Sequence, residues 1–354
     1  MNLNTVSIKL ILLTLALPSC HMKKEAAVDQ LFLPYADRDV PGAAVAVIKN
    51  GTPIFSKAYG MANLEENEPM TTGHNLRLAS VTKQFTAMSI MMLVERNLLS
   101  YNSALRFIFP SFPEYGNRIT IRHLLQHTSG LVDYESLIPD TATIQVLDQD
   151  VLTLMMLQNS TYFTPGSEYR YSNTGYALLA LVVEKLSGVS FAEFLKENIF
   201  TPLTMTNTVA YENGKSAVAN RAYGYAATDS GFVFRDQSLT SAVLGDGGIY
   251  SSVEDLYKWD QALYTEKLIT FETLTQAFTP AVLEQGQPTD YGFGWRIDEY
   301  RGHQRVHHTG STCGFATIIQ RYPEAKFTVI ILTNRSEPEL TDIANRLTDL
   351  LIGS

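Results

Sequence analysis

The sequence of 354 residues is poor in cysteine, with only Cys20 and Cys313. If Cys20 is modified, Cys313 has no partner for an intrachain disulfide, and a domain of this size does not need one. Runs of Lys and Arg are also missing, and the formal net charge is -9. Without the basic stripe that a phosphate backbone requires, nucleic acid is excluded as an expected partner.

Long apolar runs are equally scarce. Residues 10–17 form a short apolar stretch behind Lys9, too short to span a bilayer but typical of a signal peptide. The following Leu17-Pro18-Ser19-Cys20 resembles a bacterial lipobox, in which the cysteine is lipidated. We therefore expect residues 1–19 to be a lipoprotein signal peptide and residues 20–30 a polar linker. The chain would then be an exported, membrane-anchored cell-envelope lipoprotein; the alternative is plain secretion, with Cys20 in a removed leader.

Hydrophobic residues make up 45% of the whole chain, enough for a sizeable core. The apolar run 43–48 ends at Asn50-Gly51, the strongest short signal for a β-hairpin, and 54–59 would be the returning strand. Further strands are predicted near the other end, at 292–297, 305–308, 315–322 and 327–333. A last helix should follow Pro338.

The middle of the chain is predicted to be mainly helical. Ser252 and Asp255 have the spacing of a capping box, and the apolar segment 177–186 ends at Gly188. We predict an α+β fold within residues 31–354. An antiparallel sheet would be built from residues 31–100 and 285–354 and flanked by helices, with a mostly helical lobe inserted at 101–284.

The first candidate for chemistry is Ser80-Val81-Thr82-Lys83, ahead of an unusually apolar helix. Residues three apart on a helix are neighbours, so the Lys83 amine would lie beside the Ser80 hydroxyl and could take its proton. The helix N-terminus would stabilise an oxyanion. The alternative is a helix cap followed by a solvated lysine, since the pattern arises by chance about once in such a chain.

A Tyr-x-Asn pattern occurs three times, beginning at Tyr115, Tyr171 and Tyr211. Tyr171 and Asn173 follow a Pro-Gly turn and precede an apolar helix, which would brace the loop. The other two lie in polar stretches, where a surface aromatic is expected. We therefore choose Tyr171.

A third element, His308-Thr309-Gly310-Ser311, lies between two predicted strands. Gly310 would let the substrate backbone approach closely, and the Ser311 N–H could complete an oxyanion hole with that of Ser80. Taken alone, the segment is equally explained as a turn between strands.

The three elements in this order resemble the serine β-lactamase and penicillin-binding-protein family, class C type, with its Ser-x-x-Lys, Tyr-x-Asn and Lys/His-x-Gly motifs. The stretches 119–131, 245–248 and 291–295 are also similar to the family, and the resemblance covers roughly residues 38–350.

The resemblance implies an active site between the sheet and the helical lobe. Ser80 would attack a carbonyl, Lys83 and Tyr171 would share the proton transfers, and Asn173 would hold the substrate amide. Metal and organic cofactors are not implied. The expected substrates are small esters, amides or peptides, or peptidoglycan fragments; the oligomeric state stays open.

The sequence departs from β-lactamases at His308, where those enzymes have Lys. A fixed cation is replaced by a group that is ordinarily only partly charged near neutral pH. We therefore rank β-lactam hydrolysis below esterase or D-amino-acid peptidase activity. A class C-like β-lactamase and a non-catalytic penicillin- or peptidoglycan-binding protein are kept as alternatives.

A zinc site is a rival interpretation, because His123 and His127 are four residues apart. The pair lacks the glutamate of the His-Glu-x-x-His motif, and it lies within one of the stretches that resemble the metal-free family. We therefore predict no metal site.

Overall fold

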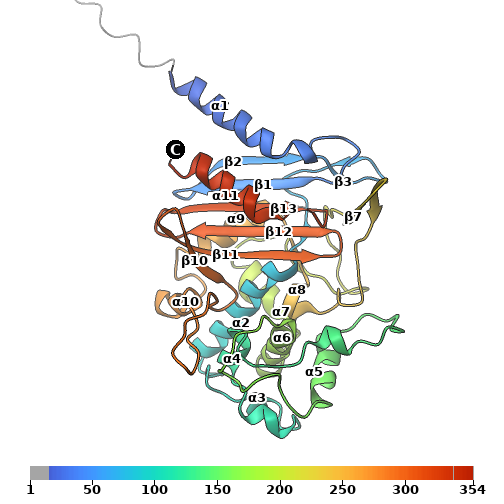
Figure 1. Ribbon diagram of the computed structural model, residues 1–354, viewed down its shortest axis with the longest axis vertical. Helices are drawn as coiled ribbons and strands as arrows, with labels where there is room; N and C mark the ends of the chain where they lie inside the picture. The colour runs from blue at the N-terminus through green and yellow to red at the C-terminus, as the bar shows by residue number, and fades with distance from the viewer. Residues whose placement is uncertain (1–15, 338, 354) are drawn as a thin grey trace, which may run out of the picture.

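A six-stranded antiparallel sheet forms the centre of the molecule (Figure 1). The structure is a computed structural model and describes residues 16–337 and 339–353; most of the predicted signal peptide, residues 1–15, therefore lies outside the described residues. The strand order is β10-β11-β12-β13-β1-β2. The strands are β1 (Ala43–Lys49), β2 (Thr52–Tyr59), β10 (Arg296–Tyr300), β11 (His303–Thr312), β12 (Phe315–Tyr322) and β13 (Phe327–Thr333).

Strand β1 joins the two ends of the chain. Ala43 lies opposite Thr333 of β13 on one side and opposite Tyr59 of β2 on the other. The β1–β2 turn contains only Asn50 and Gly51, with φ of 50° and 78°, as the tightest hairpin turns require. The predicted α+β class, with a sheet built from both termini, is confirmed.

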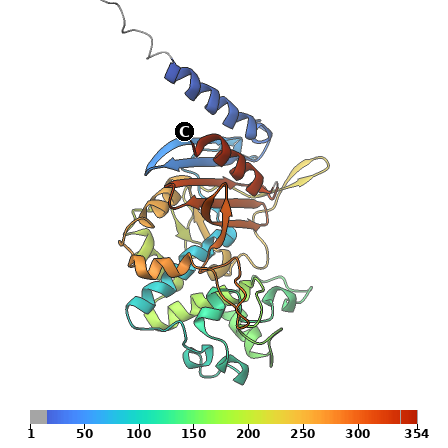
Figure 2. The same cartoon turned by 60° about the vertical axis from the view of Figure 1, so that its left-hand side comes forward.

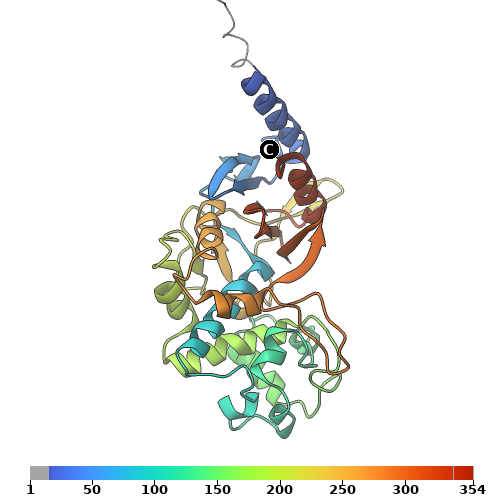
Figure 3. The same ribbon diagram turned by 90° about the vertical axis from the view of Figure 1, so that its left-hand side faces the viewer.

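Alternating side chains of the sheet supply two separate cores. In β1, Val45 and Val47 pack into one cluster, whereas Ala46 and Ile48 pack into the other. The first cluster lies under helices α1 (Ala16–Leu31) and α11 (Leu340–Leu351), and α9 (Val253–Ala262) contacts the opposite face (Figure 3).

Helix α1 occupies the segment that the sequence suggested was a linker at 20–30. A helix in this segment was not predicted from the sequence. Lys24, Glu25 and the two alanines after them are good helix formers, and Val28 is fully buried on the sheet side. Asp29 also accepts a hydrogen bond from Lys57 Nζ of β2 at 2.7 Å. These contacts fix the inner end of α1, whose outer end extends away from the sheet (Figure 1).

The other side of the sheet carries the helical lobe, in which α2 (Lys83–Glu95) and α6 (Asn173–Ser187) pack together. The interval 101–284 is less purely helical than expected, because short strands also form there. One of its helices, α9, packs on the sheet and not within the lobe. The hairpin β7–β8 extends from the body (Figure 2). None of the described helices is both long and apolar enough for a membrane span.

The remaining helices are α2 (Lys83–Glu95), α3 (Leu105–Ile108), α4 (Ile121–Leu125), α5 (Asp148–Met156), α6 (Asn173–Ser187), α7 (Phe191–Leu195), α8 (Leu244–Gly247) and α10 (Phe271–Ala277). The single-turn helices are η1 (Leu33–Tyr35), η2 (Ala79–Thr82), η3 (Glu114–Asn117), η4 (Tyr134–Leu137) and the π-helix η5 (Lys196–Phe200). The short strands are β3 (Met61–Asn63), β4 (Glu68–Pro69), β5 (Leu76–Arg77), β6 (Val209–Ala210), β7 (Tyr225–Thr228), β8 (Gly231–Phe234) and β9 (Ile249–Ser251).

Candidate active site

Ser80 lies in η2, the turn that leads from β5 into α2. The preceding Ala79 has φ of 50°, in the left-handed region that costs a non-glycine residue about 1–2 kcal/mol. Two glycines, Gly310 and Gly247, pack closely against this turn. A Cβ added at Gly310 would lie 3.1 Å from the Ala79 Cβ, and a Cβ added at Gly247 would lie 3.6 Å from the Ala79 Cα. This strained turn presents the partly exposed Ser80 to a cleft.

Lys83 is completely buried at the start of α2. Its Nζ lies 3.1 Å from Ser80 Oγ, as the i, i+3 spacing predicted. The other two contacts of Nζ are Asn173 Oδ1 at 2.8 Å and the Asp246 carbonyl oxygen at 2.9 Å. All three ammonium donors are thus directed to neutral oxygen atoms, and the Ser80 contact is short enough for direct proton transfer.

Tyr171 and Asn173 come from the loop and first turn at the start of α6. The ring centroid of Tyr171 is 5.0 Å from Lys83 Nζ, so the phenol belongs to the same cluster as Ser80 and Lys83. The Tyr171 hydroxyl is buried and has no hydrogen-bond partner within the described part of the chain. Such a hydroxyl is free to bond a group that enters the site.

His308 lies on β11 and is 2% exposed. Its Nδ1 is 2.6 Å from the Thr309 carbonyl oxygen, and its Nε2 is 2.9 Å from the Tyr291 hydroxyl. Since a carbonyl only accepts, Nδ1 carries the proton and Nε2 accepts from Tyr291. Burial, and next the positive charge of Lys83, hold the pKa of His308 well below 6.5.

The surroundings of two predicted site residues on β11 are now defined. Both ring nitrogens of His308 bond to the protein itself, and the lowered pKa favours the neutral imidazole. A Cβ at Gly310 would lie 2.3 Å from the Leu78 carbonyl oxygen. The glycine lets β11 pack against the turn of Ser80. Thr309 is partly buried, and Ser311 is exposed at the cleft.

The cleft in front of Ser80 is small, about 70 Å³, and mainly polar. Glu135 is its exposed acid and accepts a hydrogen bond from Asn173 Nδ2 at 2.7 Å. Asp246 accepts one from the Tyr134 hydroxyl at 3.0 Å, and burial raises the pKa of this carboxyl to about 6. The lining residues are Arg77, Ala79, Ser80, Tyr134, Glu135, Asn173, Thr240, Asp246, Gly247, Ser311 and Thr312.

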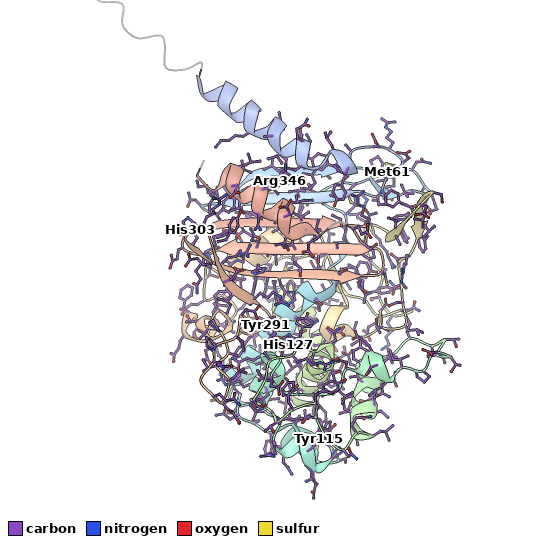
Figure 4. The ribbon with its side chains drawn as sticks, viewed as in Figure 1. Met61, Tyr115, His127, Tyr291, His303 and Arg346 are labelled. Carbon is purple, nitrogen blue, oxygen red and sulfur yellow. The ribbon has the colours of Figure 1, made fainter. Side chains whose placement is uncertain are left out.

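Sequence reasoning missed several residues of this site. Asp246, Tyr291 and His127 lie in the stretches that resemble the family, and His127 was otherwise noted only as half of a possible zinc pair. Glu135 had none, because only the packing of η4 against α6 brings it to Asn173. Tyr291 and His127 lie together where the sheet meets the lobe, whereas Tyr115 is far away at the end of the lobe (Figure 4).

The sequence had suggested that Tyr115 and Tyr211 are surface aromatics, but both make contacts within the fold. The Tyr115 hydroxyl donates to the Met155 carbonyl oxygen at 2.6 Å. The Tyr211 ring packs edge-on against Tyr250, with 5.7 Å between the centroids. Both are structural contacts.

His123 and His127 do not form a helical pair, because α4 ends at Leu125 and His127 has φ of 58°. Each Nδ1 accepts a backbone hydrogen bond instead, from Thr120 and Ser172 respectively. Among the residues that the structure describes, there is no group of three or more His, Cys, Asp or Glu side chains suited to a metal ion.

A serine in contact with a buried lysine, at the junction of an antiparallel sheet and a helical lobe, defines a serine hydrolase of the Ser-x-x-Lys type. The family model described as Beta-lactamase matches residues 28–353. The chain belongs to the β-lactamase family.

Two curated relatives illustrate its range. Penicillin-binding protein 4* of Bacillus subtilis (strain 168) is 35% identical over 330 residues, which cover 89% of this chain and 72% of the relative. A D-aminopeptidase of Brucella canis is 28% identical over 318 residues, 88% of this chain. The chain spans 60% of the length of that aminopeptidase.

Solved structures share the fold. The octameric penicillin-binding protein homologue from Pyrococcus abyssi has a TM-score of 0.80 at 28% identity, covering 94% of this chain and 77% of its own. The D-amino acid amidase from Ochrobactrum anthropi has a TM-score of 0.78, covering 94% and 99%, but at 21% identity this shows the fold alone.

Proposed function

We propose that the protein hydrolyses amide or peptide bonds of small D-amino-acid compounds that carry a free amino group. Ser80 Oγ attacks the carbonyl carbon while its hydroxyl proton is taken up by the Lys83 and Tyr171 pair. The C–N bond then breaks, a proton passes to the departing amine from the Lys83 and Tyr171 pair, and the acyl group stays on Ser80. Water releases the acid and restores the serine.

The observation that carries this substrate class is the exposed carboxylate of Glu135 in the cleft. Glu135 is exposed beside Asn173, and its carboxylate makes no ion pair among the described residues. His308, where β-lactamases carry a cation, is neutral and buried. The site therefore offers an anion to a substrate ammonium group. The D-aminopeptidase relative supports the same substrate class, and its name is also the support for the D configuration.

The test compares D-amino-acid amides with their N-acetylated forms. Wild type should prefer the free amines, and Glu135→Gln should raise their KM about 10-fold, since a hydrogen bond to a charged group contributes about 1.5–3 kcal/mol. The acetylated forms should be unaffected. Asp140→Asn, an exposed acid outside the cleft, is the matched control. Equal turnover of both forms by wild type would exclude the proposal.

Arg77 favours a second candidate function. It lines the cleft and is 2% exposed, and its Nε and Nη1 have no hydrogen-bond partner in the described part of the chain. A guanidinium with unbonded donors can bind a carboxylate. The candidate is a carboxypeptidase for peptides that end in D-Ala. Faster turnover of an N-acetylated D-Ala-D-Ala peptide than of any amide supports it, and fast turnover of a chromogenic cephalosporin would support the β-lactamase alternative.

We also propose that Cys20 is lipidated and anchors the protein to a bacterial envelope membrane. The lipobox-like sequence supports this, and so does the direction of α1, whose outer end extends away from the sheet (Figure 1). Mass spectrometry of the mature N-terminus should find a diacylated Cys20. An unmodified N-terminus beyond residue 20 would exclude the anchor.

A further inference from the structure

The segment 127–130, His-Thr-Ser-Gly, has a place in the fold that the reaction so far leaves without a role. It follows α4 and runs beside the loop that carries Tyr171. Three of its carbonyl oxygens accept backbone N–H groups from that loop, so the two segments form a ladder. The bonds are Arg170 N to His127 O at 2.9 Å, Gly166 N to Thr128 O at 2.8 Å, and Tyr162 N to Gly130 O at 2.7 Å.

His127 adds a fourth bond through its side chain. Its Nδ1 accepts the Ser172 backbone N–H at 3.0 Å, while its carbonyl oxygen accepts that of Arg170. One residue therefore holds the backbone on both sides of Tyr171. Its ring is 1% exposed and lies 4.2 Å, centroid to centroid, from the Tyr171 ring.

The ring is also fixed from its other sides. Its centroid is 4.4 Å from that of Tyr291, which bonds to His308, and 5.1 Å from that of Tyr176 on α6. The His127 backbone is in the left-handed region, with φ of 58°. A strained residue that persists inside a packed cluster is held by its surroundings, and such residues gather at functional sites.

We infer that His127 is a positioning residue, which fixes the Tyr171 phenol beside Lys83 by holding the backbone on both sides of it and packing against its ring. The inference rests on the proposed acyl-enzyme function. Nδ1 can accept the Ser172 N–H only while it is unprotonated. Burial, and next the charge of Lys83, keep the pKa of His127 well below 6.5, so the bond is maintained at neutral pH.

The test measures acylation of Ser80 by a short-chain p-nitrophenyl ester in folded variants. His127→Leu removes the acceptor, and kcat should fall about 100-fold, the cost of a misplacement of about 1 Å. KM should stay within about 3-fold, because the bond is not made to substrate. His127→Asn places an amide oxygen near the Nδ1 position and should recover most of the loss. An Asn variant as slow as the Leu variant, at equal thermal stability, overturns the inference.

Two controls separate positioning from stability. His123 Nδ1 also accepts a backbone N–H, from Thr120 at 3.2 Å, but at the N-cap of α4. His123→Leu should therefore leave kcat within about 3-fold of wild type. In a Tyr171→Phe background, His127→Leu should have little further effect, since the two residues act as a unit. A full additional loss in that background would contradict the inference.

The ester assay also keeps this test independent of the natural substrate. Failure of wild type to hydrolyse D-amino-acid amides would exclude the proposed substrate class, yet acylation of Ser80 by the ester would still report on His127. Failure of Ser80→Ala to abolish labelling by a fluorophosphonate would overturn the acyl-enzyme itself, and the role of His127 with it.

Discussion

Two of the buried cations in the described part of the chain, Arg321 and Lys83, have opposite surroundings. Arg321 of β12 and Asp260 of α9 are both fully buried, with Nε 2.5 Å from Oδ1, and Thr328 donates to the same carboxylate at 2.8 Å. Lys83 is equally buried, but no described residue forms an ion pair with it, and its partners are a hydroxyl, an amide oxygen and a backbone carbonyl.

The difference separates a structural charge from a reactive one. A carboxylate neutralises Arg321 and joins α9 to the sheet. Lys83 makes no such direct ion pair among the described residues; its charge acts at longer range, partly offsetting the burial that raises the pKa of the Asp246 carboxyl and helping to hold His308 neutral. The contacts of Lys83 are to neutral oxygen atoms that include the Ser80 hydroxyl, so its amine is placed to act on the nucleophile, whereas the guanidinium of Arg321 is held by its carboxylate.

Replacing Lys83 should have the largest effect. Lys83→Met should lower kcat/KM about 1,000-fold or more, because the base for Ser80 is lost. The free energy of unfolding should change by less than about 1 kcal/mol, since the lost hydrogen bonds are offset by removal of an unpaired buried charge. Esterase kinetics measure kcat/KM, and urea denaturation measures the free energy of unfolding. If Lys83→Met loses stability but keeps its activity per folded molecule, Lys83 has a structural role and not a reactive one.

Replacing Arg321 should give the opposite result. Arg321→Met leaves Asp260 buried without its partner and should cost about 3–5 kcal/mol of stability. The activity per folded molecule should be retained. The double variant Arg321→Met, Asp260→Leu should recover most of the lost stability in urea melts. If the double variant recovers no stability, the Arg321–Asp260 pair stabilises the fold by more than the mutual neutralisation of its charges.

Lowering the pH should destabilise the region around Lys83. Because the folded-state pKa of His308 is well below 6.5, its contribution is fully present above pH 6.5 and is lost as the pH falls, when the unfolded chain takes up a proton that the folded protein does not. Between pH 7 and 5, the free energy of unfolding obtained from thermal melts should decrease less steeply for His308→Gln than for wild type, by up to about 1.4 kcal/mol per pH unit. Parallel curves for both proteins would argue against a neutral His308.

The smallest effect is expected at an ion pair near the surface. Asp29 of α1 contacts Lys57 of β2 at 2.7 Å, with side chains 34% and 40% exposed. Asp29→Asn should cost about 0.5 kcal/mol, because solvent screens such pairs. A loss of several kcal/mol in urea denaturation would show that α1 depends on this contact far more than exposed pairs allow.

Local signals predicted much of the sheet. The bounds of β12 and β13 agree with the predicted strands because both are continuous runs dominated by apolar residues, separated by a Pro-containing turn. The predicted strand at 292–297 begins only at Arg296, since Gly294 adopts φ of 76° in a preceding turn. The helix α1 was not predicted because its contact with the sheet depends on two buried apolar side chains, Val28 and Leu31, within a largely polar stretch.

The site was predictable only where motif and spacing coincide. The three-residue spacing of Ser80 and Lys83 directly gave their contact. The charge of His308 could not be read from the sequence, because burial and the positive charge of Lys83 determine it. Glu135 lacked any sequence signal, and its proximity to Asn173 arises from long-range packing.

The position of β1 between β2 and β13 has a consequence for how the protein folds. Residues 43–49 must wait for residues 327–333 before both sides of the strand are hydrogen-bonded. Until nearly the whole polypeptide has been synthesised, the hairpin has an open edge and an uncovered apolar surface. Such non-local pairing slows folding and exposes the nascent polypeptide to aggregation. We therefore expect chaperones to bind the incomplete chain until its last strand closes the sheet.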